Sequence, residues 1–383
     1  MNIIILLVVA AVLCSGRIAL AAGPDPVDWG TPPFWKSKTM AGESALPLAG
    51  SGGVVAMTLA FTPTKILAVK DITGKVLYEA GHDYVWKPGQ RTLQVPKGSR
   101  IPVATDAQLY PPKGSQKFGT CATRITDLWY VEGMEYQRLQ AAVTYVHQLD
   151  DWETPATLTD VGTLPKLAKK LAAKQAIKLV LLGDSISAGC NASATCKAPP
   201  FMPAYGDLVA AQLAKTFRAT AQVKNLSVAG MNAAWGVGQM SAVAKEKPDL
   251  LLIAFGMNDA SGDVSVGAFI ASVRGMIDGL KKSTPDAEVV LVAPMTANPE
   301  WTGARPPMYS AYRDALLKLK GEGVIVADVT SVWTFFVSRK KYCDLTGNGL
   351  NHPNDFGYRL YAQVISAAIT QAAGPQAPAN PGK

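Results

Sequence analysis

Five short runs rich in apolar residues recur through the second half of the chain. They occupy residues 179–182, 221–226, 250–255, 289–292 and 324–329. Strands that are apolar on both faces are typical of a parallel sheet covered by helices, because neither face meets water. Stretches with helical patterning separate them, at residues 202–217, 264–282, 307–319 and 355–372. We therefore predict a three-layer α/β/α sandwich over residues 170–373, with any active site outside the carboxyl ends of its strands.

The first half of the chain has a different rhythm, in which short strand-favouring segments alternate with turn residues. These segments are residues 54–61, 65–72, 75–79, 92–95, 128–131 and 137–146. They predict a small β-sandwich over residues 24–155, with the domain boundary between about 150 and 170. The aromatic residues of this half include Trp86, Trp129, Tyr130 and Tyr145. Such residues form either a platform for stacking sugars or, more often, part of the core.

The N-terminal segment is typical of an export signal. Its apolar stretch, residues 3–13, is too short to span a bilayer, and Ala19-Leu20-Ala21 is a small-x-small cleavage pattern, although no Lys or Arg precedes the stretch. We expect residues 1–21 to be removed, leaving a secreted or periplasmic protein without stable membrane insertion. The tail, residues 374–383, is rich in Pro, Gly and Ala and is predicted to be disordered.

Composition and charge add little about a partner. A chain of 383 residues that is 48% apolar is long enough for two domains. Its net charge of +8 would suit an anionic partner. Part of that charge, however, is a lysine run that we assign to a solvated helix face, at Lys166, Lys169, Lys170, Lys174 and Lys178. No nucleic-acid-binding module is recognisable, and we expect no nucleic acid partner.

Four cysteines follow the predicted export signal. They are Cys121, Cys190, Cys196 and Cys343. Export permits disulfides, and Cys190 and Cys196 bracket a short loop, so we expect a local bridge there and a Cys121–Cys343 bridge across the domains. Free buried thiols are the alternative. The spacing does not suggest a zinc site, and we predict neither metal nor cofactor.

The candidate chemistry begins at a serine directly after an apolar strand. Gly183-Asp184-Ser185 follows the apolar run at residues 177–182. The chain has three histidines, His82, His147 and His352, and only His352 lies beyond residue 150, on a loop rich in Gly and Asn. A serine at a strand end and a histidine brought to it by the fold are the parts of a hydrolytic nucleophile–base pair.

Four short sequence motifs, or blocks, taken in their order along the chain, resemble those of one protein family. They are Gly183-Asp184-Ser185, the segment from Asn225 to Gly230, Gly256-Met257-Asn258-Asp259, and His352-Pro353. Their order resembles that of the SGNH, or GDSL, hydrolase family over residues 177–372. The resemblance implies a flavodoxin-like fold and ester cleavage without a cofactor. It also assigns the nucleophile to Ser185, the base to His352, and oxyanion-stabilising N–H groups to the Gly230 backbone and the Asn258 side chain.

The chemistry of ester attack requires the same parts. A serine that attacks an ester creates a tetrahedral oxyanion, and losing one preorganised donor costs about 3–4 kcal/mol of transition-state stabilisation. Glycine at position 230 avoids a side chain that would obstruct the substrate. Each residue alone has a simpler structural explanation: Ser185 as a helix cap, Gly230 and Asn258 as turn residues, His352 as a loop residue. The four together favour catalysis.

One position departs from the family pattern. The family usually places an aspartate three residues before the histidine, where this chain has Gly349. Asp344 on the same loop, Asp355 in the next helix or a backbone carbonyl are candidates to orient the imidazole, and the third member of the triad stays unassigned. Asp259 is predicted to fix the Asn258 loop.

The two-domain arrangement is similar to that of exported bacterial carbohydrate esterases, which makes a sugar O-acetyl ester the first hypothesis for the substrate. Trp235 and Trp301 are either walls of the site that stack on a sugar or ordinary packing residues. Three alternatives remain. The first is a lipase-like or thioesterase-like member of the family, the second is a sugar O-acetyltransferase, and the third is a glycan-binding protein without catalytic activity.

Overall fold

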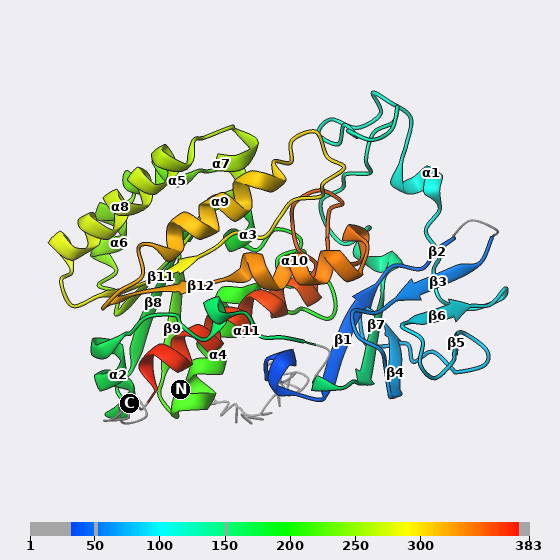
Figure 1. Ribbon diagram of the computed structural model, residues 1–383, viewed down its shortest axis with the longest axis horizontal. Helices are drawn as coiled ribbons and strands as arrows, with labels where there is room; N and C mark the ends of the chain where they lie inside the picture. The colour runs from blue at the N-terminus through cyan, green and yellow to red at the C-terminus, as the bar shows by residue number, and fades with distance from the viewer. Residues whose placement is uncertain (1–31, 50–52, 150–151, 375–383) are drawn as a thin grey trace, which may run out of the picture.

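The structure is a computed structural model that describes residues 32–49, 53–149 and 152–374. Figure 1 shows a β-rich N-terminal part beside a larger α/β part. The predicted export signal lies outside the described residues, as does the predicted tail apart from Gly374.

The C-terminal part is built on a five-stranded parallel sheet. Its strands are β8 (Ile177–Gly183), β9 (Ala221–Asn225), β10 (Leu250–Ala254), β11 (Glu288–Val292) and β12 (Val324–Ala327). Their order is β12-β11-β10-β8-β9. This is the flavodoxin-like order, in which the first strand of the unit lies between the second and the third. The predicted fold class is confirmed. Ligand sites in such sheets lie where the order reverses, here between the carboxyl ends of β8 and β10.

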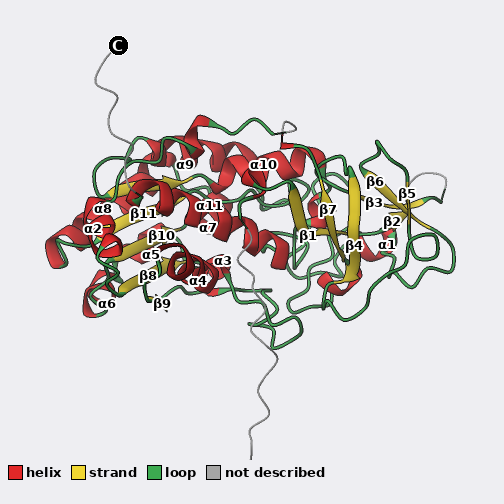
Figure 2. Cartoon of the chain, turned by 90° about the horizontal axis from the view of Figure 1, so that it is seen from below, coloured by secondary structure: helices red, strands yellow, loops and turns green. Residues whose placement is uncertain are grey.

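Helices cover both faces of this sheet, as Figures 1 and 2 show. One face carries α2 (Pro165–Ala172), α4 (Tyr205–Phe217) and α11 (Asp355–Ala373). The other carries α5 (Ala233–Val237), α6 (Met240–Lys245), α8 (Val266–Ser283) and α9 (Pro306–Leu317). The one-turn helices α3 (Ser185–Ala188) and α7 (Met257–Ser261) begin directly after β8 and β10.

Helix α10 (Val329–Arg339) was not expected from the sequence, which placed residue 329 at the end of a strand. The segment is rich in aromatic and β-branched residues, which favour strands over helices. Asp328 nevertheless begins a helix, because its side chain accepts a hydrogen bond from the backbone N–H of Ser331. Packing against α9 and α11 then outweighs the local preference.

The N-terminal part contains two antiparallel sheets. The first has the order β1-β7-β4, formed by β1 (Thr39–Ala45), β7 (Ala141–Val146) and β4 (Lys65–Asp71). The second has the order β2-β3-β6-β5, formed by β2 (Leu48–Ala49), β3 (Val55–Thr58), β6 (Thr92–Val95) and β5 (Val85–Trp86). Short helical turns complete this part and its connections: η1 (Phe34–Lys36), α1 (Asp106–Leu109), η2 (Gln137–Leu139), η4 (Ala156–Leu158) and, before the His352 loop, η5 (Tyr342–Asp344).

Several local predictions are wrong. Residues 75–79 and 128–131 form isolated bridges or loops instead of strands, and residues 137–139 form a 3-10 turn. The segment around Cys121 pairs with Trp301 of the C-terminal part, so long-range contacts fix its path. Lys178 lies in β8 and pairs with Glu246 at 2.6 Å, whereas the lysine run was assigned to a helix.

The cysteine prediction is also corrected. All four cysteines of the described residues are free thiols, so neither the Cys190–Cys196 nor the Cys121–Cys343 bridge is present in this structure. Cys121 and Cys343 belong to different small apolar clusters. Burial raises the pKa of the Cys190 thiol to about 11. Such a thiol stays protonated near neutral pH and is a weak nucleophile.

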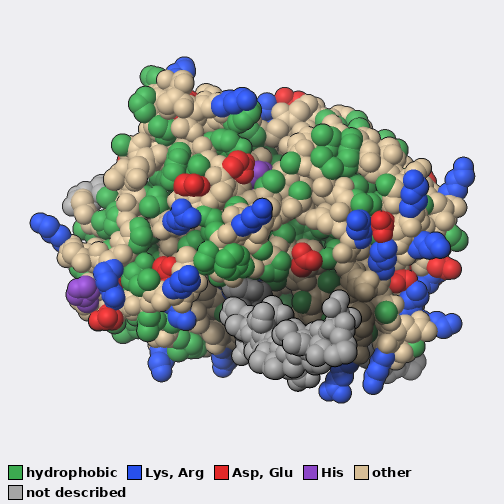
Figure 3. Space-filling view, turned by 180° about the vertical axis from the view of Figure 1, so that it is seen from behind, with side chains coloured by type: hydrophobic (Ala, Val, Ile, Leu, Met, Phe, Trp, Pro, Cys, Tyr) green, Lys and Arg blue, Asp and Glu red, His purple; other side chains and the backbone are tan. Residues whose placement is uncertain are grey.

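The two parts share one hydrophobic core. Phe34 and Phe61 of the N-terminal part contact Phe336 of α10, and the continuous cluster extends into the parallel sheet. On the surface, Lys and Arg side chains are scattered over the face shown in Figure 3 among apolar and polar ones. No helix of the described residues combines the length and the apolar character needed to cross a bilayer.

Candidate active site

Ser185 lies at the turn from β8 into α3. Strand β8 ends at Gly183, and Asp184 caps α3 by accepting a hydrogen bond from the Ile186 backbone at 3.0 Å. Ser185 is the first residue of the helix and is almost fully buried. A Cβ on Gly183 would lie 2.3 Å from the Ser187 hydroxyl and 2.5 Å from the Ala254 carbonyl oxygen, so the turn needs glycine there.

His352 is held on a loop that one side chain organises. The amide oxygen of Asn348 accepts hydrogen bonds from the backbone N–H groups of Leu350, Asn351 and His352, at 3.0, 3.0 and 3.1 Å. His352 is buried, with its side chain 9% exposed. Its Nε2 lies 2.9 Å from the Ser185 hydroxyl, so the structure brings together the two residues that the sequence singled out.

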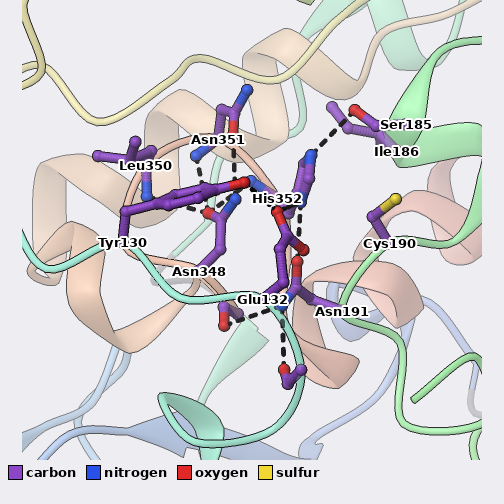
Figure 4. A network of polar contacts seen from close by, with 12 residues as sticks. Tyr130, Glu132, Ser185, Ile186, Cys190, Asn191, Asn348, Leu350, Asn351 and His352 are labelled. Carbon is purple, nitrogen blue, oxygen red and sulfur yellow. Dashed lines mark hydrogen bonds and ion pairs between the residues drawn. The ribbon is translucent and has the colours of Figure 1, made fainter. Parts of the chain in front are cut away.

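Asn191 contacts the other nitrogen of the ring (Figure 4). Its Oδ1 lies 2.8 Å from His352 Nδ1. The Asn191 amide nitrogen donates to the carbonyl oxygens of Gly133 and Gly347, at 3.0 and 3.3 Å, which fixes the amide orientation. The oxygen therefore accepts from Nδ1–H, and Nε2 is left as the acceptor for the Ser185 hydroxyl. That tautomer is the one a general base requires.

The acids considered from the sequence lie elsewhere. Asp344 accepts hydrogen bonds from the backbones of Leu46 and Lys341, at 2.7 and 3.2 Å. Asp355 accepts from the Ser193 backbone at 2.9 Å. The carboxylate near the ring is Glu132 of the N-terminal part, whose Oε1 lies 3.5 Å from His352 Nδ1. Neither Asn191 nor Glu132 was recognisable from the sequence, because both lie outside the family blocks.

Gly230 and Asn258 lie in neighbouring loops at the carboxyl end of the sheet. Gly230 has a φ of +80°, which favours glycine, and a Cβ there would meet nothing within 4 Å. Asn258, the second residue of α7, donates to the carbonyl oxygen of Met231 at 2.9 Å, which ties it to the Gly230 loop. Asp259 accepts from the Ala233 backbone at 3.1 Å, which ties the Asn258 turn to the start of α5.

The four sequence blocks thus meet at one edge of the sheet. Val228 donates to the Gly183 carbonyl oxygen at 3.1 Å, and Ala254 pairs with Gly183 across β10 and β8. The other two histidines lie apart: His82 pairs with Asp83, and His147 stacks on Phe61. No group of three or more His, Cys, Asp or Glu side chains suited to a metal ion occurs among the residues that the structure describes.

Aromatic residues near the site have mixed environments. Tyr145 is fully buried, as the core interpretation predicted, and Trp235 packs against Phe255. Tyr130 is half-buried, and its hydroxyl donates to Glu132, next to His352. Trp301 donates its indole N–H to the Phe118 carbonyl oxygen at 2.8 Å and packs with Leu350 and Tyr130 in one cluster.

Comparison with known protein families finds a match that spans the four sequence blocks from Ser185 to His352. The GDSL-like Lipase/Acylhydrolase family matches residues 181–360. The matched segment carries Ser185, Gly230, Asn258 and His352. A search of curated proteins found no match to the chain.

The solved structures that match part of this chain have low sequence identity to it. A two-domain esterase (CEX) active on acetylated mannans is 23% identical, with a TM-score of 0.47, and the alignment covers 60% of each chain. The aligned part therefore spans less than two thirds of that esterase. A carbohydrate esterase family 3 structure from Talaromyces cellulolyticus is 17% identical, with a TM-score of 0.39 over 51% of this chain and 98% of that one. The lipase Lip_vut3 from a goat rumen metagenome is 15% identical, with a TM-score of 0.41 over 50% and 97%.

Proposed function

We propose that the protein is a serine esterase that removes O-acetyl groups from a carbohydrate through an acyl-enzyme intermediate. One observation carries the proposal: the hydroxyl of Ser185 donates to a buried imidazole at 2.9 Å, and Asn191 holds that imidazole in the tautomer of a base. The match to the GDSL-like family supports the reaction type.

The proposed reaction has two halves. In the first, His352 Nε2 takes the proton of Ser185 as its oxygen attacks the ester carbonyl, and the resulting imidazolium gives that proton to the departing sugar oxygen. In the second, water attacks the acetyl-serine with His352 again as base, and acetate leaves. The backbone N–H groups of Ser185 and Gly230 and the Asn258 amide are proposed to stabilise the oxyanion. One Asn258 N–H bonds Met231, which leaves the other for the substrate.

A carbohydrate substrate is favoured by the aromatic surface beside the site. Phe118 is 53% exposed and contacts Tyr130 edge-on, and Tyr130 reaches the residues around His352. Partly exposed aromatic faces next to polar groups suit the apolar face and hydroxyls of a sugar ring. We also propose that the protein is exported by its N-terminal segment and that residues 24–155 and 170–373 act as accessory and hydrolase domains.

Acetate release from acetylated xylan, by the wild type and by Ser185→Ala, tests the reaction. The variant is expected to lose about 10⁴-fold or more of kcat, because the group that forms the acyl-enzyme is removed. Ser272→Ala is the control, since the Ser272 hydroxyl bonds only the Ala268 backbone within α8. Equal release by wild type and Ser185→Ala would reject the nucleophile.

The substrate class needs a separate measurement. We expect nitrophenyl acetate to be cleaved faster than nitrophenyl esters with long acyl chains, and acetylated glycans to be deacetylated. A preference for long chains would favour the lipase-like alternative instead. Acetyl transfer to an added sugar acceptor, in place of acetate release, would identify a transferase.

A further inference from the structure

The imidazole at the proposed active site has a charged neighbour from the other part of the chain. We propose that Glu132 of the N-terminal part is a positioning residue that stabilises the His352 imidazolium during ester cleavage, replacing the acid that is absent at Gly349. This inference rests on the proposed esterase function. Its geometric basis is the distance of 3.5 Å between Glu132 Oε1 and His352 Nδ1.

Asn191 alone does not supply what a triad acid supplies. Its amide fixes the tautomer and the orientation of the ring, but it is neutral. When His352 takes the Ser185 proton, a positive charge forms on a buried side chain. A buried charge needs a partner, and Glu132 is the carboxylate on the same side of the ring as Asn191, opposite Ser185 (Figure 4).

The surrounding contacts hold Glu132 in place. The Tyr130 hydroxyl donates to Glu132 Oε1 at 2.5 Å, and the Tyr130 backbone N–H donates to Gln116 at 3.2 Å. The next residue, Gly133, accepts the hydrogen bond from Asn191, so the backbone beside Glu132 is tied to the residue that orients His352. Partial burial opposes ionisation of Glu132, but interactions with His352, Tyr130 and Asn348 outweigh it and hold its pKa below the usual value.

The position of Glu132 in the chain explains why it was not recognisable from the sequence as the missing acid. Glu132 precedes the family blocks by about fifty residues and belongs to the other part of the chain. The proposed hydrolase therefore needs its N-terminal part to complete the surroundings of its base. A stand-alone hydrolase segment would lack this carboxylate.

Exposure to solvent limits how much the charge of Glu132 can change the rate of ester cleavage. The Glu132 side chain is 48% exposed, so water and salt screen its charge. A charge at this distance in a strongly screened setting alters a cationic transition state by about tenfold. We expect Glu132→Gln to lower kcat about tenfold and to leave KM unchanged, because the residue acts through His352 and does not touch the substrate.

The experiment measures kcat and KM for nitrophenyl acetate with the wild type, Glu132→Gln, Glu132→Asp and Tyr130→Phe, together with the thermal midpoint of each. Glu132→Asp keeps the charge and is expected to recover part of the loss. Tyr130→Phe removes only the hydroxyl that holds the carboxylate and is expected to lower kcat a few-fold. Glu135→Gln is the matched control, an exposed carboxylate in the same loop.

The outcomes separate this inference from the proposed function. A kcat for Glu132→Gln within twofold of the Glu135→Gln value would overturn the role of Glu132, as would a change confined to KM. A loss that Glu132→Asp does not relieve would also overturn it, because the charge would then not matter. Ester cleavage that survives Ser185→Ala would instead reject the esterase proposal itself.

Discussion

Asp184 is a buried carboxyl beside the proposed nucleophile. Burial, together with the nearby charge of Asp259, raises the pKa of Asp184 to about 7, although its carboxylate accepts a backbone hydrogen bond from Ile186. The folded protein therefore binds this proton more tightly than the unfolded chain does. Between the ordinary aspartate value and about pH 7, stability falls as pH rises, since the unfolded state releases the proton first.

We expect Asp184→Asn to remove this part of the pH dependence. An asparagine caps a helix about as well as an aspartate, so α3 is retained. The free energy of unfolding should exceed that of the wild type by about 3–4 kcal/mol near pH 8, and the difference should shrink toward about pH 4. Urea unfolding of both proteins at about pH 5 and pH 8 measures it. The control is Asp278→Asn, at an exposed position on α8, and a curve for Asp184→Asn parallel to the wild type would contradict the prediction.

The partners of His352 show which residues sequence alone identifies. Ser185 and His352 were identified because each lies in a short block whose residue types the chemistry dictates. Asn191 was not identified, because the hydrogen bonds that orient its amide toward the ring go to Gly133 and Gly347, which lie far away in the sequence. Asp344 looked suitable by its position on the loop, but the tertiary structure uses it to bond Leu46 of the N-terminal part.

At the scale of secondary structure, strand β8 and its turn position the nucleophile. The turn packs so closely that Gly183 lies against both Ser187 and the carbonyl of Ala254 in the adjacent strand β10. The apolar pattern predicted all five strands of this sheet: β8, β10, β11 and β12 are buried on both faces, which leaves a strong signal, whereas β9 is a partly exposed edge strand. It missed α10 and the path of residues 96–136, which depend on contacts between the two parts.

Gly183→Ala should disturb both stability and activity. The added methyl group has no space, and overpacking of this kind costs about 1–3 kcal/mol. Displacement of the turn by even a fraction of an ångström moves Ser185 relative to His352, so kcat should fall by about tenfold or more. Urea unfolding and the rate of nitrophenyl acetate cleavage test both effects.

Gly267→Ala is the matched control for that substitution. Gly267 lies in α8, and a Cβ there meets nothing within 4 Å. Alanine is the better helix former, so this variant should be unchanged or more stable by up to about 1 kcal/mol. Equal urea midpoints for Gly183→Ala and the wild type would show that the turn can relax.

At the scale of the whole molecule, a buried ion pair joins the two parts. Lys340, at the end of α10, bonds Glu43 of β1 at 2.5 Å, and both side chains are fully buried. Lys340 also donates to the carbonyl oxygens of Ser44 and Thr58, at 2.8 and 2.9 Å. Tyr145 donates to the second carboxylate oxygen of Glu43. The pair therefore fixes β1 against the segment that leads through η5 to the His352 loop.

Lys340→Met should destabilise the whole protein by about 3–5 kcal/mol, because it leaves the Glu43 carboxylate buried without a counter-charge. Glu43→Gln should cost less, since its single amide oxygen can still accept from Ala60 and Lys340, and Lys340 keeps its bonds to two backbone carbonyl oxygens. In the double variant the two losses should not add, with a coupling of about 1–3 kcal/mol.

Urea unfolding followed by tryptophan fluorescence and by far-ultraviolet circular dichroism should give one coincident transition, because both parts share a core. Additive losses, or two separate transitions, would mean that the N-terminal part and the hydrolase part are stable independently of each other.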